Sequence, residues 1–310
     1  MRRARLFWQE TPPLTTDSAA MNDEVLKVFQ EWSSPVRLNF ALLLTAIAYI
    51  RGWHQLRKAC PRMFSVTHLA AFLTGVFSLW VAIGSPLSAF DDVSLSVHMV
   101  QHLLLMAVAP PLVLLGAPAL PLLHGLHARV VRRALGPVLR WKPVQRLGRF
   151  LAQPVTCWLT ATIALFAWHV PAAFDLALGS DLWHEVEHAC FFSTSLLFWW
   201  PVVQPYPSKP IWPRWAIPIY LFFGMMPCGV LGAFLCFSDK VVYPAYSAAP
   251  NIFGLTPLDD QVFAGAFMWV FGTFVYLIPA VIITTKLLSS ETYGTSEARM
   301  SRREAANDSV

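Results

Sequence analysis

Residues 95–115 read LSVHMVQHLLLMAVAPPLVLL, a stretch without a single Asp, Glu, Lys or Arg. About 20 apolar residues in a helix cross the hydrocarbon core of a bilayer, so this stretch predicts a transmembrane helix. It carries His98 and His102 near its start, four residues apart, which places both imidazoles on one helix face about 6 Å apart along the axis. Ionisable groups inside a membrane are costly and usually functional. One stretch therefore predicts both a membrane span and a candidate site.

Six further apolar runs occur elsewhere in the chain. They extend from Val36 to Gly52, Val66 to Gly84, Val155 to Pro171, Glu187 to Val203, Trp215 to Phe237 and Phe263 to Leu287. The chain is 56% hydrophobic and 13% charged, with a mean hydropathy of +0.51, which excludes a soluble domain of ordinary composition. We expect an all-α integral membrane protein, a bundle of seven transmembrane helices within residues 36–288.

The loops between these runs differ in charge. Lys and Arg concentrate in the first, third and fifth loops and in the tail, whereas the second and fourth loops contain Asp and neither Lys nor Arg. Cytoplasmic loops of membrane proteins carry the excess of Lys and Arg. The sequence therefore predicts that the N-terminus is outside and the C-terminus cytoplasmic. Membrane orientation also explains the formal net charge of +5 without a nucleic-acid partner.

Two terminal segments flank the predicted bundle. In the N-terminal tail, residues 1–35, apolar side chains recur at helical spacing at Val25, Leu26, Phe29 and Trp32, which predicts a short helix in the membrane interface. Residues 289–310 are polar and predict a disordered cytoplasmic tail. The five cysteines form no CxxC pair, so neither a zinc knuckle nor a complete disulfide framework is indicated.

Five of the nine histidines fall at the outer end of the predicted bundle: His98, His102, His169, His184 and His188. Two pairs among them share a four-residue spacing on different helices, which is how helical bundles build metal and haem sites. Met106 continues the stripe of the first pair one turn further in. Carboxylates that could orient the rings lie at the same level, at Glu185, Glu187, Asp259 and Asp260. The alternative is that these imidazoles only hydrogen-bond neighbouring helices.

Prolines interrupt two of the predicted spans. Pro110 and Pro111 lie in the third apolar run, and Pro218 and Pro227 lie in the sixth. A proline within a helix leaves a backbone carbonyl without its usual donor and bends the helix. We therefore expect the bundle to be kinked near its centre.

Several long motifs occur in a fixed order from the first apolar run onward. They are HMVQHLLLMAVAPPLVLLGAP (98–118), WHVPAAFDLAL (168–178), HEVEHACFFSTSLLFWWPV (184–202), VLGAFLCFSDKVVYPAY (230–246) and GLTPLDDQVFAGAFMW (254–269). With these motifs the chain resembles the seven-helix CtaG-type assembly factors of caa-type cytochrome c oxidases. Together they are far more specific than a lone HxxxH.

The resemblance implies a multi-pass protein of the bacterial plasma membrane that is needed to build haem–copper oxidase. It implies partners among the oxidase subunits or other assembly factors, placement of copper in the catalytic subunit, and no enzymatic turnover. The positions that it implies for the metal are the five outer histidines. The outer acidic motif that it implies consists of Asp259, Asp260 and Gln261.

Three functions are compatible with the residues themselves. An assembly factor would hold copper at the imidazoles, and the Met106 thioether would favour the reduced ion. A haem-binding cytochrome or haem-handling factor would use the same histidines as axial ligands. An ion or proton transporter would use the His and Asp residues as a relay. A relay should cross the membrane, and the clustering of these residues at one end argues against transport.

Overall fold

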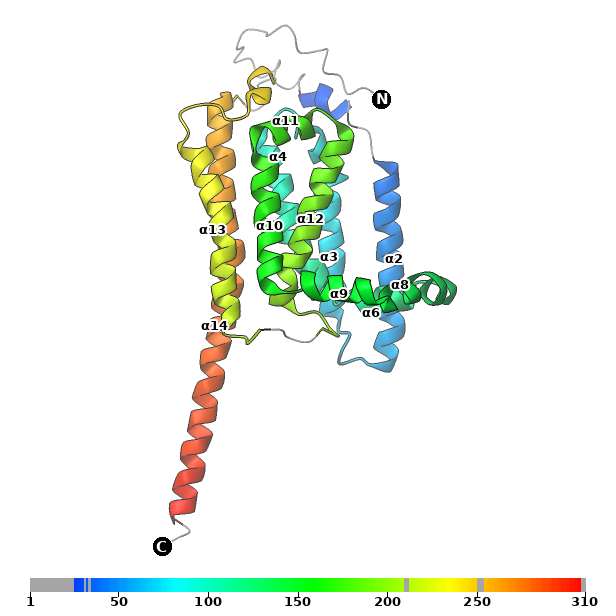
Figure 1. The fold of residues 1–310 in the computed structure, drawn as a ribbon, viewed down its shortest axis with the longest axis vertical. Helices are drawn as coiled ribbons and strands as arrows, with labels where there is room; N and C mark the ends of the chain where they lie inside the picture. The colour runs from blue at the N-terminus through cyan, green and yellow to red at the C-terminus, as the bar shows by residue number, and fades with distance from the viewer. Residues whose placement is uncertain (1–24, 31, 33–34, 209–211, 250–253, 308–310) are drawn as a thin grey trace.

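Long helices that lie side by side make up most of the described chain (Figure 1). The structure is a computed structural model and describes residues 25–30, 32, 35–208, 212–249 and 254–307, among which no strand occurs. The lengthwise helices are α2 (Val36–Ala59), α3 (Val66–Ile83), α4 (Leu95–Leu103), the π-helical turn η2 (Leu104–Val108), α5 (Ala109–Leu115), α10 (Pro154–His169), α12 (Asp181–Val203), α13 (Ala216–Phe237) and α14 (Pro257–Asn307). Each apolar run of the sequence falls on one of these helices or helix series.

Four of the described helical stretches are long and apolar enough to cross a membrane: Val66–Ala89, Leu95–Leu115, Ala216–Phe237 and Pro257–Ser289. A fifth is added if α9 (Lys142–Leu151) and α10, which meet at a bend of 75°, form one span. Two other predicted spans, α2 and α12, are less apolar. Their sequences include Arg37 and Arg51 in α2 and Glu187 and His188 in α12. In α12 the polar side chains belong to the candidate site described below.

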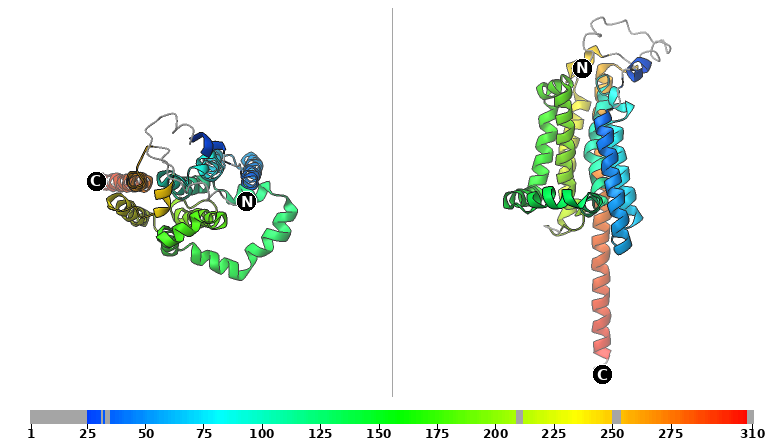
Figure 2. Two further views of the ribbon diagram at one scale, coloured as in Figure 1. Left: turned by 90° about the horizontal axis from the view of Figure 1, so that it is seen from above. Right: turned by 90° about the vertical axis from the view of Figure 1, so that its right-hand side faces the viewer.

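A series of short helices crosses the bundle at one end, where the sequence predicts only a basic loop. It comprises α6 (Ala119–Gly125), α7 (Ala128–Val130), the π-helical turn η3 (Val131–Leu135), α8 (Gly136–Arg140) and α9. The view from above in Figure 2 shows this green segment as an arc at the edge of the bundle. Leu147 and Phe150 of α9 are exposed beside Arg146 and Arg149. This mixture of apolar and basic side chains is typical of a helix lying in a membrane interface.

Two prolines leave carbonyl oxygens free within the bundle, and a tryptophan compensates each. Pro110 has no N–H for the carbonyl of Met106, and the Trp199 indole Nε1 donates to that oxygen at 3.0 Å. Pro227 likewise leaves the carbonyl of Phe223 without a donor, and Trp158 Nε1 donates to it at 3.0 Å. The predicted interruption of the third span is present as the π-helical turn η2, just before Pro110.

Close helix approach depends on glycine at the contact of α2 with α6. A Cβ atom on Gly52 would lie 1.8 Å from the carbonyl oxygen of Pro121, and one on Gly125 would lie 1.7 Å from that of Ala48. Both distances are far below van der Waals contact. Glycine therefore lets the two backbones meet directly.

The terminal segments are helical where they are described. Residues 25–30 form a short helix in which Val28 is buried against Phe90, and the ring centroids of Phe29 and Phe90 are 5.0 Å apart. Residues 1–24 of the predicted N-terminal tail lie outside the described part. At the other end, α14 continues to Asn307, well beyond the other helices (Figure 1), where the sequence predicts disorder. Extending an existing helix needs no new nucleus, so a polar segment can continue one.

Candidate metal site

Three helices bring the five histidines together at one end of the bundle, hereafter the histidine end. His98 and His102 lie on α4, His169 is the last residue of α10, and His184 and His188 lie in the first two turns of α12. The short helix α11 (Pro171–Leu178) connects α10 to α12 at this end (Figure 1). The end of one helix and the starts of two others therefore meet. These residues are called the five-histidine cluster below.

The rings of the five-histidine cluster form one continuous set of contacts. Within each helix the centroids of a pair are 4.2 Å apart, for His98 with His102 and for His184 with His188. Between α4 and α12 the His98 and His184 rings are 5.5 Å apart and nearly parallel. The His102 ring lies 5.8 Å from both His169 and His188. The structure thus brings together all the histidines that the sequence selected.

The interior of this cluster is buried, and several of its polar atoms have no hydrogen-bond partner among the described residues. His98 and Glu187 are fully buried, and His102 is 2% exposed. Within the part of the chain that the structure describes, neither ring nitrogen of His98 or His102 has a hydrogen-bond partner, and neither oxygen of Glu187 does. Buried polar atoms are almost always paired, because leaving one unpaired costs about 1–3 kcal/mol. Unpaired imidazole nitrogens and carboxylate oxygens have the lone pairs that a metal ion would need.

A carboxylate lies beside each histidine pair. Oε1 of Glu187 is 3.7 Å from Nε2 of His102, and Oδ2 of Asp91 is 3.7 Å from Nε2 of His184. The ligand atoms of His98, His102 and Glu187 all lie within 4.8 Å of one another. Glu187 thus stands among the ligand atoms themselves rather than behind them. Asp91, which lies in the loop before α4, was not selected from the sequence.

The tautomer of His169 is fixed by its hydrogen bond. Its Nδ1 lies 2.7 Å from the carbonyl oxygen of Leu165, which can only accept, so Nδ1 carries the proton. The lone pair is then on Nε2, which is buried and has no hydrogen-bond partner within the described residues. This nitrogen is left as a ligand atom. Backbone hydrogen bonding of the opposite ring nitrogen is the usual way in which a metal-binding histidine is oriented.

The family model for the cytochrome c oxidase caa3 assembly factor (Caa3_CtaG) matches residues 47–290, which contain every residue of the cluster. The chain belongs to this family. Curated relatives of the chain include an uncharacterized protein of Mycobacterium leprae, 24% identical over 86% of this chain and 40% of the relative. Uncharacterized proteins of Mycobacterium bovis and Mycobacterium tuberculosis are each 26% identical over 92% of this chain and 42% of the relative. The chain thus spans about two fifths of their length. No solved structure matches it.

The acidic residues Asp259 and Asp260 make contacts other than the orientation of a histidine ring. The Asp260 carboxylate accepts hydrogen bonds from the backbone N–H groups of Leu95 and Ser96, at 2.7 and 3.2 Å, and from the Ser94 hydroxyl at 3.1 Å. It therefore caps the start of α4, the helix that carries His98. Asp259 accepts a hydrogen bond from Thr256 at 2.6 Å and is exposed.

Gln261 and Glu185 also differ from the sequence expectation. Gln261 accepts from the Val242 N–H at 2.7 Å and donates to the carbonyls of Leu235 and Lys240, so it ties α14 to the loop after α13. Glu185 is exposed. Residues two apart do not share a helix face, so of this pair only Glu187 joins the histidines.

Tyrosines from the loop after α13 cover the cluster. The Tyr243 hydroxyl donates to the His169 carbonyl at 3.0 Å, and the Tyr246 hydroxyl donates to the Asp91 carbonyl at 2.8 Å. Burial and nearby carboxylates raise the pKa of both phenols, which keeps them protonated as donors. Sequence spacing gave no sign of these contacts, because the tyrosines lie far along the chain from their partners.

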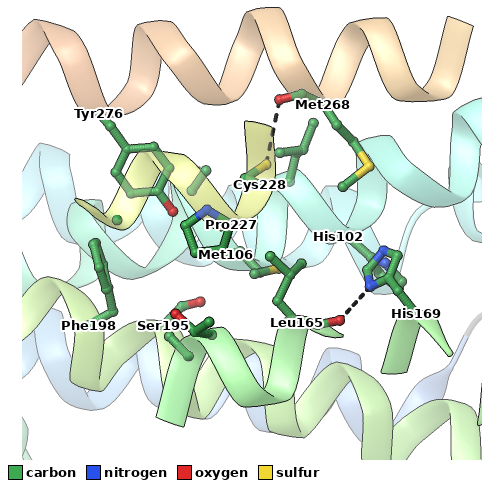
Figure 3. Close-up of a pocket in the computed structure, with 15 residues that line it drawn as sticks. His102, Met106, Leu165, His169, Ser195, Phe198, Pro227, Cys228, Met268 and Tyr276 are labelled. Carbon is green, nitrogen blue, oxygen red and sulfur yellow. Dashed lines mark hydrogen bonds between the residues drawn. The ribbon is translucent and has the colours of Figure 1, made fainter. Parts of the chain in front are cut away.

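Met106 lies in a small cavity directly next to the cluster (Figure 3). The cavity has a volume of about 30 Å³, and His102 and His169 form its wall toward the histidine end. The thioether of Met106 therefore shares a space with two of the imidazoles, as the His98–His102–Met106 stripe predicts.

Proposed function

We propose that this caa3 assembly factor holds copper at the five-histidine cluster and delivers it to the haem–copper catalytic subunit of cytochrome c oxidase. The observation that carries the proposal is the set of buried ligand atoms on His98, His102 and Glu187, which lie within 4.8 Å of one another without hydrogen-bond partners in the described chain. In this role copper is cargo, and the protein turns over no substrate.

The chemistry of the donor set suits copper. Neutral imidazole is a good ligand for copper in both common oxidation states, and Glu187 supplies a negative charge that offsets the charge of a buried cation. The His169 ring lies 5.8 Å from that of His102, and its buried Nε2 has no hydrogen-bond partner among the described residues. Asp91 stands 3.7 Å from His184 and can accept a proton from, or orient, that ring. More imidazoles are present than one ion needs, which fits a site that exchanges its cargo.

Haem and transport receive less support from the geometry. The imidazole rings stand 4.2 to 5.8 Å apart and the adjoining cavity measures about 30 Å³, so a porphyrin would have to separate the helices widely. A proton or ion relay needs ionisable groups along the whole span. Among the residues that line the cavity, the titratable groups other than the histidines are the Cys228 thiol and the Tyr276 phenol, and there is no carboxylate.

Membrane placement determines where the transfer would occur. Charge distribution in the loops favours seven spans in a bacterial plasma membrane, with the N-terminus outside and the C-terminus cytoplasmic. The histidine end then faces outward, where an oxidase subunit or another assembly factor could receive the ion.

Elemental analysis of the purified protein, together with its visible spectrum, tests the proposal. We expect at least one copper per chain and no Soret band. Stoichiometric haem would overturn the proposal, and so would a protein that retains no copper after anaerobic loading with Cu(I). The full chain in detergent is the sample, because the cluster is assembled from three helices of the bundle.

A further inference from the structure

A sulfur-lined cavity continues inward from the five-histidine cluster. Three sulfur-bearing residues line it from three different elements: Met106 of η2, Cys228 of α13 and Met268 of α14. Figure 3 shows Met268 extending from α14 toward His102 and His169, and Met106 near the centre of the cavity. With a volume of about 30 Å³, the cavity has room for one or two water-sized species.

Two backbone features, the π-helical turn η2 and Gly272, make room for Met106 and Cys228 beside the cavity. The π-helical turn η2 contains Met106, and the Trp199 hydrogen bond to the Met106 carbonyl stabilises that turn. On the opposite wall, a Cβ atom on Gly272 would lie 3.1 Å from Sγ of Cys228, so glycine leaves room for the thiol. The thiol donates only a long hydrogen bond, 3.6 Å, to the carbonyl of Met268. That weak bond can be exchanged for a metal bond at small cost.

We propose that this cavity is a second copper position, specific for Cu(I), with the sulfur atoms of Met106, Cys228 and Met268 as ligands and His102 at the boundary with the five-histidine cluster. The inference rests on the proposed function and adds a second copper position beside the five-histidine cluster. Thioether and thiolate are soft ligands that suit Cu(I), and two thioethers in the set favour Cu(I) over the harder Cu²⁺ ion. The buried imidazole of His102, whose ring nitrogens have no hydrogen-bond partner within the described residues, lines the same cavity.

Charge neutrality favours this position at depth in a membrane. A monovalent cation bound by thioethers alone would bury a net positive charge, which is costly in hydrocarbon. When Cys228 binds, its S–H bond breaks, an S–Cu(I) bond forms and one proton is released to the buffer, so the ion and its thiolate are together neutral. No oxidant or reductant is required, because copper remains Cu(I) throughout.

X-ray absorption at the copper edge tests the inference on the full-length protein in detergent. The protein is loaded anaerobically with one and then two equivalents of Cu(I). We expect sulfur neighbours of copper in the wild-type spectrum, and their loss in the variant M106L/C228S/M268L, while nitrogen neighbours and at least one bound copper remain. Met→Leu changes conserve volume, so the variant should retain its fold.

Matched controls use sulfur residues outside the cavity. Met99 and Cys157 are buried but do not line it, so M99L/C157S should keep the sulfur signal. In the opposite direction, H98A should lose nitrogen neighbours and keep sulfur, because His98 does not line the cavity. A wild-type spectrum with nitrogen or oxygen neighbours only, at both loadings, would overturn the second site and leave the proposed function standing. Failure of the wild type to retain any copper would overturn both.

Discussion

The indole nitrogen of Trp199 donates a hydrogen bond of 3.0 Å to the carbonyl oxygen of Met106. Pro110 leaves that oxygen without its usual donor within the helix. The contact therefore joins α12, which carries His184 and His188, to the span that carries His98 and His102. It positions Met106 directly inward of the histidines.

Replacing Trp199 with Phe should destabilise the protein. The ring would still fill its space, but the buried Met106 carbonyl would lose its partner, at a cost of about 1–3 kcal/mol. Thermal unfolding in detergent measures the effect. Trp215→Phe is the matched control, because Trp215 is 64% exposed, and it should shift the unfolding temperature little. Equal shifts for the two variants would show that the hydrogen bond does not matter.

Replacing both His98 and His102 with Ala should remove the nitrogen-bound copper of the five-histidine cluster, so that bound copper falls by about one ion per chain. Both rings contribute ligand atoms to the set that includes Glu187, and no other residue of α4 carries an imidazole. Oxidase assembled in cells with this variant should lack its catalytic copper. The control is His124→Ala with His127→Ala, because these residues lie on and beside α6, outside the cluster. Normal copper content and oxidase activity in the double α4 variant, at equal expression, would make those histidines structural.

Replacing Asp260 with Asn should weaken copper binding without removing any ligand. The carboxylate caps α4 through Leu95 and Ser96, so its loss loosens the start of the helix that carries His98. We expect a decrease in Cu(I) affinity of about tenfold, measured by competition with a chromophoric chelator. Asp259→Asn should leave the affinity unchanged, because Asp259 is exposed and pairs only with Thr256 among the hydrogen bonds described. If both variants kept the wild-type Cu(I) affinity, the Asp260 cap of α4 would not contribute to copper binding.

Replacing Gly52 with Ala should be strongly destabilising. The added methyl group would overlap the Pro121 carbonyl, so α2 and α6 would have to separate, at a cost of about 1–3 kcal/mol or more. Gly148→Ala provides the comparison, since a Cβ atom there has no neighbour within 4 Å among the described residues. That change should be neutral or stabilising by up to about 1 kcal/mol. Thermal unfolding of the two variants should therefore shift in opposite directions or differ by several degrees.

Cysteine labelling on intact cells tests the orientation. Cys60 is exposed just after α2, and Cys236 lies near the end of α13 at the opposite end of the bundle. In single-cysteine variants, a membrane-impermeant thiol reagent should reach Cys236 and not Cys60. The reverse pattern would place the histidine end in the cytoplasm and would exclude copper transfer at the outer face.

Features that depend on neighbouring positions in the chain, such as helices and shared helix faces, could be predicted from the sequence alone. Apolar runs of about 20 residues predict helices because every backbone polar group in lipid must be satisfied within its own segment. Four-residue spacing puts His98 with His102, and His184 with His188, on single helix faces. The prolines marked where the third span is interrupted. The same periodicity could have separated Glu187 from Glu185, since only Glu187 follows His184 by three residues.

Only the tertiary structure decided which faces meet. Asp91 reaches His184 from a loop before α4, Asp260 caps α4 from the start of α14, and Trp199 pairs with a carbonyl about ninety positions earlier in the chain. Such contacts depend on how helices pack against one another, and no periodicity within one segment encodes the neighbour that its side chains will find. The sequence determined what each helix presents, and packing determined that five imidazoles, a carboxylate and the sulfur-lined cavity lie together at one end of the bundle.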